Sequence, residues 1–283
     1  MYLKKTFEAI GILTLLLFSF VFTEKTALVA INQDDIMKQI EIIKNNYSEK
    51  IIEPIITENT FIPGKCGLEI DTKQSYYNMK KQGIFNENLL VFKDICSKET
   101  LKKNKNKFII GGNKEEKKIS LLFINSQTNK LNTILKILSD NEVNANIFVD
   151  GSVFEKNNDL INEISKNHII GNLSYNRDYN NPSFIWMTTI IKKFNDNYCY
   201  TENLDESILK ICSKNNSYTI VPNIVIKTNP ALTLTKNLTN GSIISLYIND
   251  EVIKELEIMI KHIKSKGYNV VTLSELLEEK IKN

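Results

Sequence analysis

The chain has 283 residues, of which 42% are hydrophobic, and its 36 basic and 33 acidic residues leave a net charge of +3. This length and composition predict one good-sized core with a smaller folded part, and they exclude a disordered chain. The near balance of charge excludes the strong field that attracts nucleic acid, so we expect no nucleic-acid partner. Dense basic patches lie at 102–107 and 114–118, and we interpret them as solvated surface rather than as an anion-binding site.

The N-terminus has the pattern of an export signal. Lys4 and Lys5 precede an uncharged apolar run of 14 residues at 9–22. Such a helix would measure about 21 Å, less than the ~30 Å hydrocarbon core, which favours a signal peptide, but no A-x-A cleavage site follows. Residues 1–30 are therefore predicted to be either a signal peptide or an uncleaved membrane anchor. In both cases we expect export to the extracellular face of the cell membrane or to the cell envelope.

Residues 31–117 are predicted to form a small N-terminal α+β module. Apolar spacing predicts a helix over 34–46, and a second helix over 71–82 begins after Asp71 as N-cap and ends before Gly83. Short β-branched or apolar runs predict strands, at 51–61, 89–92 and 108–110. This module contains no recognisable catalytic set of residues.

From residue 118 onward, strand and helix patterns alternate. Apolar runs predict strands at 119–124, 146–149, 168–171, near 198, and at 218–221, 242–247 and 269–272. Helical spacing predicts helices at 131–138, 159–165, 183–194, 205–212, 250–266 and 274–281. Repeated βα units predict an α/β fold with a parallel sheet that is closed or nearly closed into a barrel. Functional residues are then expected on the loops after the strands.

Four cysteines are an even number in a chain that is expected to be exported. No pair has the C-x-x-C spacing of a zinc or redox site. Cys199 and Cys212 flank a predicted helix, so a disulfide between them is possible and would contribute about 3 kcal/mol by loop closure. Two buried free thiols are the alternative.

Several segments of residues 118–279 match a known family in order: KKISLLFINS, LKILSDNEVNANIFVDG, NHIIGNLSYNRDY, NGSIISLYIND and IKHIKSKGYNVVTLSELLE. They resemble the polysaccharide deacetylases with a NodB-homology domain. The resemblance implies a distorted, incomplete (β/α) barrel over residues 118–283, preceded by the small module and the N-terminal segment.

The resemblance also implies a chemistry, which this chain does not reproduce. Family members hold a metal, usually zinc, with one Asp and two His, and use an Asp as base and a late His as acid. The matching positions carry other residues: Ile124 for the base, Asn125, Leu173 and Arg177 for the metal ligands, and Tyr247 for the acid. The chain has two histidines. His168 is expected to be a buried framework residue on a strand, and His262 is expected to face solvent or pack on its long helix. A degenerate member without zinc, cofactor or catalytic residues is therefore expected.

Polar and aromatic side chains remain near the expected strand ends, and they are the candidate binding residues: Asn125, Ser174, Tyr175, Arg177, Asp178 and Tyr247. Groups of this kind bind sugar hydroxyls and stack on sugar rings. The alternative is a structural role, in which Arg177 and Asp178 pair with each other and Tyr247 fills the space of the lost histidine. Trp186 lies in an apolar helical run and is expected in the core.

Three hypotheses follow. The first is an exported cell-envelope protein whose degenerate deacetylase-like domain binds cell-wall glycan or an envelope protein without catalysis. The second is an active carbohydrate deacetylase, of the peptidoglycan type, that hydrolyses N- or O-acetyl groups with a rearranged site. The third is a structural component of an envelope assembly.

Overall fold

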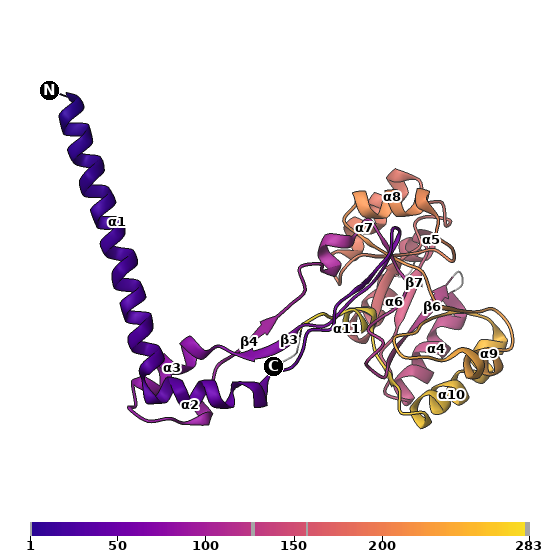
Figure 1. Ribbon diagram of the computed structural model, residues 1–283. Helices are drawn as coiled ribbons and strands as arrows, with labels where there is room; N and C mark the ends of the chain where they lie inside the picture. The colour runs from indigo at the N-terminus through magenta and orange to yellow at the C-terminus, as the bar shows by residue number, and fades with distance from the viewer. Residues whose placement is uncertain (1, 126–127, 157, 281–283) are drawn as a thin grey trace. The chain divides into compact units, whose positions relative to one another are not determined.

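The computed structural model describes residues 2–125, 128–156 and 158–280. The chain forms two compact units: the first comprises residues up to 50 together with 67–95, and the second comprises 51–66 together with the chain from residue 96 onward (Figure 1). This division differs from the predicted boundaries at residues 30 and 117. The physical reason is that residues 51–66 and 96–117 contribute strands to the large sheet of the second unit, so they pack with that unit and not with the helices of the first.

The first unit contains helices α1 (Tyr2–Gln33), α2 (Asp35–Ile43) and α3 (Thr72–Lys80), and the antiparallel pair β3 (Gly67–Ile70) and β4 (Phe92–Ile95). Its small core joins α2 to α3 through buried side chains, which are Ile36, Met37, Ile40, Ile70, Tyr76 and Met79. The N-cap prediction for α3 is confirmed, since Asp71 accepts a hydrogen bond from the Gln74 backbone. No helix in the described part of the chain combines the length and the apolar character needed to cross a membrane.

The predicted strand at 89–92 is displaced: a 3-10 turn covers Glu87–Leu89, and β4 begins at Phe92. Asn86 explains the shift, because its side chain accepts a hydrogen bond from the Asn88 backbone and starts the turn. Two 3-10 helices, Lys44–Tyr47 and Glu87–Leu89, therefore belong to the first unit.

The second unit is built on one large sheet whose strands run in the order β1-β2-β5-β10-β9-β8-β7-β6-β12-β11, with β13 beside β6. The strand bounds are β1 (Ile55–Ile56), β2 (Thr60–Ile62), β5 (Phe108–Ile109), β6 (Lys118–Asn125), β7 (Asn146–Val149), β8 (Ile169–Asn172), β9 (Tyr198–Tyr200), β10 (Tyr218–Ile220), β11 (Ile224–Ile226), β12 (Ile243–Tyr247) and β13 (Asn269–Val270). The β1–β2 pair is antiparallel and the other pairs are parallel. The sheet curls without closing, so the predicted incomplete α/β barrel is confirmed.

Helices connect the parallel strands and cover the sheet (Figure 1). Their bounds are α4 (Thr128–Asp140), α5 (Gly151–Lys156), α6 (Asn158–Asn167), α7 (Asn181–Ile191), α8 (Glu206–Lys214), α9 (Pro230–Asn237), α10 (Asp250–Ser265) and α11 (Leu273–Leu276). Strand β6 shows why both faces are apolar. Its side chains alternate between the two layers: Leu121 and Phe123 pack under the helices, while Leu122 and Ile124 face the inner core.

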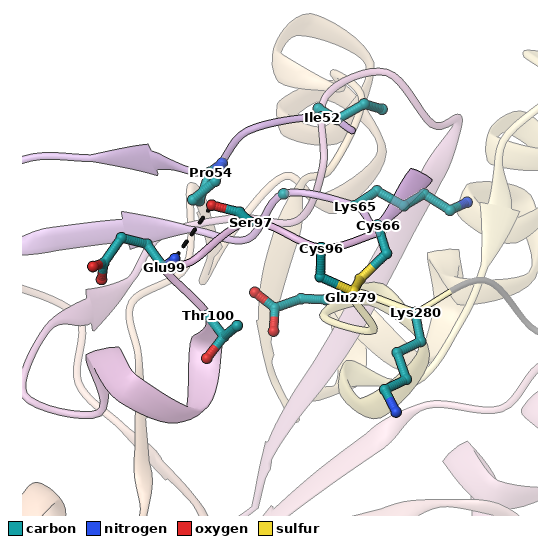
Figure 2. A pocket seen from close by; sticks show the side chains of 11 residues that line it. Ile52, Pro54, Lys65, Cys66, Cys96, Ser97, Glu99, Thr100, Glu279 and Lys280 are labelled. Atoms are coloured by element: carbon teal, nitrogen blue, oxygen red, sulfur yellow. Dashed lines mark hydrogen bonds between the residues drawn. A yellow bond between two sulfur atoms is a disulfide. The ribbon is translucent and has the colours of Figure 1, made fainter. Parts of the chain in front are cut away.

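A disulfide joins Cys66 and Cys96, which both belong to the second unit. The segment between them, residues 67–95, belongs to the first unit. Figure 2 shows this bond beside a small hollow of about 90 Å³ that Glu279 also lines. The Cys66 backbone amide donates to the Glu279 carbonyl at 2.6 Å, which attaches the bond to the end of the described chain. A closed loop of this sequence separation, 30 residues, contributes between about 3 and 4 kcal/mol by loop closure.

Candidate functional site at the carboxyl ends of the strands

The candidate binding residues lie where β6, β8 and β12 end. These strands are parallel and belong to the central run β8-β7-β6-β12, so their carboxyl ends meet at one edge of the sheet. Asn125 ends β6, where its backbone pairs with Val149 of β7; its side chain lies outside the described part of the structure. Tyr247 ends β12 and pairs with Ile124. The remaining candidates lie on the loop after β8.

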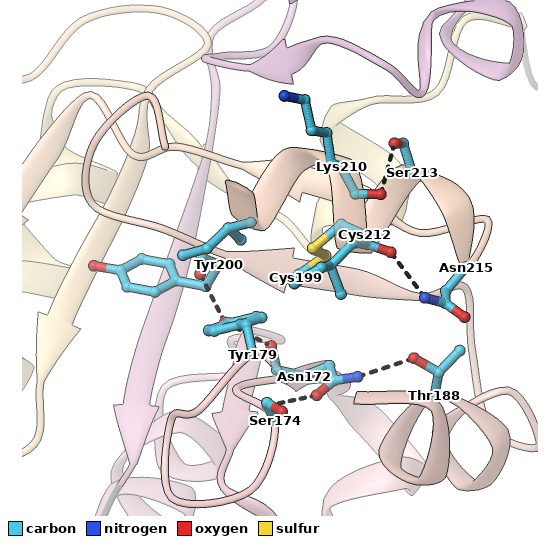
Figure 3. Close-up of a disulfide and its surroundings, with 12 residues drawn as sticks. Asn172, Ser174, Tyr179, Thr188, Cys199, Tyr200, Lys210, Cys212, Ser213 and Asn215 are labelled. Atoms are coloured by element: carbon cyan, nitrogen blue, oxygen red, sulfur yellow. Dashed lines mark hydrogen bonds between the residues drawn. A yellow bond between two sulfur atoms is a disulfide. The ribbon is translucent and has the colours of Figure 1, made fainter. Parts of the chain in front are cut away.

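That loop, residues 173–180, is held by its own hydrogen bonds. Ser174 is fully buried, and its backbone amide donates to Asn172 Oδ1 at 2.7 Å while its hydroxyl donates to the Asp178 carbonyl at 2.6 Å. Figure 3 shows the Asn172 side chain between Ser174 and Thr188, to whose hydroxyl it donates at 3.1 Å. Ser174 therefore shapes the loop.

The backbone of the loop adopts left-handed conformations at Ser174 (φ 62°), Asn176 (φ 53°) and Arg177 (φ 55°). Such conformations are uncommon outside glycine and need fixed partners. One partner is Asp150, a carboxylate directly after β7 that is 5% exposed and accepts from the Arg177 backbone amide at 2.8 Å. Asp150 also accepts from the backbone amide and hydroxyl of Ser152. Sequence reasoning missed Asp150, although a lone carboxylate after an apolar strand was a visible signal.

Tyr179 attaches the far end of the loop to β9. Its hydroxyl donates to the Tyr200 carbonyl at 2.7 Å and to the Asn172 carbonyl at 3.2 Å (Figure 3). Burial raises the pKa of the Tyr179 hydroxyl, so the group stays a neutral donor at physiological pH. Beside it Cys199 of β9 and Cys212 of α8 form a disulfide, with both residues fully buried. The pairing considered from the sequence is thus present.

Leu173 and Ile124 are core residues. Each is 2% exposed, and both belong to the inner apolar cluster with Phe148, Tyr200 and Ile243. The Leu173 backbone amide donates to the Val149 carbonyl at 3.1 Å and continues the strand pairing. The two positions that the family resemblance assigns to a metal ligand and to the base therefore carry packed hydrocarbon side chains.

Arg177 and Tyr247 are brought together, with two residues that sequence reasoning missed. The Arg177 guanidinium lies 5.7 Å from the centre of the Tyr247 ring, and the Lys227 ammonium lies 5.0 Å from it. The Tyr247 hydroxyl donates to Glu202, whose carboxylate also pairs with Lys227 at 2.8 Å. We call Arg177, Glu202, Lys227 and Tyr247 the strand-end cluster. Lys227 follows β11 directly and Glu202 lies two residues after the end of β9, so position after a strand was the available signal.

The pKa shifts of Tyr247 and Glu202 agree with the hydrogen bonds and charges of this cluster. Burial raises the pKa of Tyr247, and its hydrogen bond to Glu202 raises it further. Burial also raises the pKa of Glu202, but hydrogen bonds from Lys227 and Tyr247 and the positive charges of Lys227 and Arg177 outweigh it, so that this pKa falls below its ordinary value. With Tyr247 neutral and Glu202 ionised, the four side chains carry a net charge of +1.

Asp178 and Tyr175 have other partners than this cluster. The Asp178 carboxylate accepts from the backbone amide and side chain of Asn180, at 3.1 and 2.7 Å, and so builds the turn into α7. Tyr175 donates to Glu155 at 3.1 Å, and its ring lies edge-on to Trp186 at 6.3 Å. The core prediction for Trp186 is wrong, since its side chain is 37% exposed. The reason is that the outward face of α7 is itself apolar, so helical spacing alone did not identify the buried face.

These side chains do not fit a zinc site. Zinc sites use Cys, His, Asp or Glu, whereas the strand-end positions present leucine, arginine and tyrosine. Among residues 2–125, 128–156 and 158–280, no three His, Cys, Asp or Glu side chains gather as a ligand group. His168 has the predicted framework role: it is half-buried, accepts from the Ala145 backbone amide at Nδ1, and burial lowers its pKa.

Known proteins resemble this chain in sequence and in fold. YlxY of Bacillus subtilis, an uncharacterized protein, is 28% identical over 244 residues, which cover 77% of this chain and 75% of YlxY. The structure of wild-type BA3943 of Bacillus anthracis, a CE4 family pseudoenzyme, superposes with a TM-score of 0.66 at 23% identity and covers 88% of this chain and 97% of its own. PdaA of Bacillus subtilis, a family 4 carbohydrate esterase, has a TM-score of 0.53 at 20% identity and covers 62% and 86%.

The structural matches share the curled sheet and its helices, which is the framework that positions the strand ends described above. In sequence, the family model for polysaccharide deacetylase matches residues 111–221, which run from before β6 to the end of β10 and include the whole loop after β8. Residues 111–221 therefore match the polysaccharide deacetylase family model, and the second unit has the fold of the NodB-type deacetylases.

Proposed function

We propose that this chain is a non-catalytic polysaccharide deacetylase-like protein of the cell envelope, and that it binds glycan at the carboxyl ends of its strands. The observation that carries this proposal is the strand-end cluster. Arg177 and Tyr247 stand at positions that the family resemblance assigns to a metal ligand and to the catalytic acid. The Arg177 guanidinium lies over the Tyr247 ring, and Tyr247 contacts Glu202 and Lys227.

The charges of the cluster oppose the family reaction. A divalent cation would approach a net positive group next to the hydrocarbon side chains of Leu173 and Ile124, which offer it no ligand. Without the metal, the acetyl carbonyl loses its electrophilic partner, and without the base and the acid, water is not activated. Losing one oxyanion donor alone typically costs about 10² to 10³ in rate.

The surface next to the cluster suits a sugar. The exposed Trp186 ring lies edge-on to the half-buried Tyr175, which comes two residues before the exposed Arg177. Aromatic rings pack on the apolar faces of sugars, and a guanidinium donates several hydrogen bonds to hydroxyl or acetyl oxygens. The fold relatives support this direction: BA3943 is a pseudoenzyme of which a mutant has restored enzymatic activity, and PdaA is a carbohydrate esterase.

Placement in the envelope is supported by two features of the chain. Lys4 and Lys5 precede the apolar run at 9–22, as in an export signal. All cysteines of the chain are joined in two disulfides, Cys66–Cys96 and Cys199–Cys212, and such bonds persist in oxidising compartments outside the cytosol.

Two measurements on the purified full chain test the loss of catalysis. The first is metal content after incubation with zinc, for which we expect less than stoichiometric retention after gel filtration. The second is acetate release from acetylated peptidoglycan and chitin fragments, for which we expect none with or without added metal. Acetate release that depends on a bound metal would overturn the proposal and favour an active deacetylase with a rearranged site.

Binding is tested separately, with peptidoglycan fragments in a calorimetric titration. We expect Trp186→Ala and Arg177→Ala to weaken binding by about tenfold or more each, because stacking and charged hydrogen bonds are of that size. Ile258→Ala is a matched control, since Ile258 is also an exposed apolar side chain and lies on α10. Failure of the wild-type chain to bind these fragments would contradict the glycan assignment and leave a protein partner or a structural role in the envelope.

A further inference from the structure

A second polar hollow, of about 480 Å³, lies where β9 and β10 begin, at the edge of the sheet opposite the strand-end cluster. Its wall combines the turn after α7 with residues that precede β5 and β10. Lysines dominate it: Lys105, Lys192 and Lys193 line the hollow, and Asp196 is the acidic residue among the lining side chains. The hollow therefore carries a net charge of +2 from these four side chains.

The lysines of the hollow are not neutralised. None of Lys105, Lys192 and Lys193 forms an ion pair with another residue in the ranges that the structure describes. Lys105 is instead held by neutral groups: its ammonium donates to Asn216 Oδ1 at 2.6 Å and lies 4.7 Å from the centre of the Tyr218 ring. Burial lowers the pKa of Lys105, and the charges of Lys102 and Lys192 also lower it, while the Asp196 carboxylate acts in the opposite direction.

An unsatisfied acceptor lines the same hollow. Asn197 is 4% exposed, and its side-chain oxygen has no hydrogen-bond partner among the described residues. Buried polar atoms in folded proteins are almost always paired, so an unpaired one that lines a hollow indicates a missing donor. The backbone of Asn197 is held at this wall, since its carbonyl accepts from the Tyr218 amide at 2.9 Å.

An aromatic wall continues from this hollow into a neighbouring one of about 280 Å³, with which it shares Asp196, Tyr218 and Ser274. The rings of Tyr198 and Tyr218 lie 5.8 Å apart with an angle of 31° between their planes. Glu275 and Glu278 line the outer part of the neighbouring hollow, so an anionic group is favoured only on the lysine side. The two hollows together therefore offer lysine ammonium groups, the Asn197 side-chain oxygen and a tyrosine ring next to one another.

We propose that this lysine hollow binds an anionic sugar, with the acidic group on Lys105 and Lys193, a hydroxyl donating to Asn197 Oδ1, and the ring against Tyr218. A lysine cluster alone accepts any anion, whereas the unpaired acceptor and the aromatic face also require a hydroxylated ring. The acidic group is either a carboxylate, as in a uronic acid, or a phosphate ester. This site is separate from the glycan surface proposed at the other edge of the sheet.

The test is a calorimetric titration of the full chain with matched small sugars: glucuronate, glucose 6-phosphate and glucose, with inorganic phosphate as the anion without a ring. We expect saturable binding of at least one anionic sugar, about tenfold or more tighter than glucose and than inorganic phosphate, because charged hydrogen bonds and the ring contact each contribute on this scale. Preference for glucuronate or for glucose 6-phosphate distinguishes the two acidic groups.

Variants assign the binding to the hollow. Lys193→Gln and Lys105→Gln are each expected to weaken anionic-sugar binding by about tenfold. Lys193 is exposed, so its replacement keeps the fold. Lys210→Gln, at an exposed lysine of α8, removes the same charge elsewhere and should leave the affinity unchanged. Arg177→Ala should also leave it unchanged, which separates this site from the strand-end cluster.

Three outcomes would overturn the proposal: anionic sugars that bind no more tightly than glucose, inorganic phosphate that binds as tightly as the anionic sugars, or an affinity that Lys105→Gln and Lys193→Gln leave unaltered. The second would indicate a simple anion site without recognition of a ring.

Discussion

Replacing the strand-end side chains by the ligands of the family tests whether the backbone still has the geometry of a metal site. The decisive comparison is between Leu173→His alone and the same change together with Asn125→Asp and Arg177→His. Histidine is tolerated at residue 177, because its left-handed backbone, φ 55°, is one that histidine adopts more readily than most residues.

The magnitude follows from the position of Leu173 in the inner core, where 2% of it is exposed. Removing a buried leucine side chain forfeits about 1.5–3 kcal/mol of apolar burial. A buried imidazole without a partner costs about 1–3 kcal/mol more. The single variant should therefore lose about 2.5–6 kcal/mol of unfolding free energy. In the triple variant, zinc at a thousand times its dissociation constant returns about 4 kcal/mol.

The assay is urea unfolding near neutral pH with and without zinc, together with the zinc content of the folded protein. Leu173→Met is the control, since a volume-conserving apolar change should cost less than about 1.5 kcal/mol. We expect zinc to stabilise the triple variant and to leave the wild type and Leu173→His unaffected.

Two results would refute the reasoning. A Leu173→His variant as stable as the wild type would mean that residue 173 does not belong to a packed core. A triple variant that folds but takes up no zinc would mean that the backbone of the loop after β8 no longer has the geometry of a metal site, in addition to the replacement of its side chains.

Further predictions concern the framework of the second unit. Replacing Cys199 and Cys212 by serine should lower the unfolding free energy by about 3 kcal/mol, because the bond closes a loop with a sequence separation of 13, and an unchanged urea midpoint would contradict this. Burial holds the pKa of His168 below its ordinary 6.5, so the neutral form is favoured in the folded chain. The stability that depends on this form should be lost as the pH falls from about 6.5 through the lower folded pKa, and unfolding curves of His168→Gln should lack that loss. Gly171→Ala should destabilise strongly and broaden the near-ultraviolet signal, since its Cβ would lie 2.3 Å from a Phe148 ring carbon; a variant as stable as the wild type would argue against this packing.

Much of the second unit could be predicted from local pattern. The apolar run at 119–124 is long enough to be a strand buried on both faces, and it lies within β6. The strand at 146–149 has the predicted bounds, and the helix at 250–266 ends within one residue of α10. These strands and helices are regular and bury one or two continuous faces, so the spacing of their apolar residues is enough to predict them.

Other elements escaped prediction because they are short or lack a period. Strand β11, Ile224–Ile226, and helix α9, Pro230–Asn237, have too few residues for a reliable pattern. Strand β5, Phe108–Ile109, lies within the strand predicted at 108–110, but its partners β2 and β10 are distant in sequence and could not be predicted from it. The compact units differ from the predicted boundary at residue 117 because these partners of β5 lie in the second unit.

The amino-acid sequence by itself determined the fold family and the replacement of the family's metal and catalytic residues, because both depend on residue type along a continuous pattern. The tertiary structure decided what the replacements do. Leu173 joined the core, Ser174 and Asp178 built the loop, and Arg177 and Tyr247 met Glu202 and Lys227. These contacts arise where parallel strands far apart in the chain end side by side, and only the order of strands in the sheet brings those ends together.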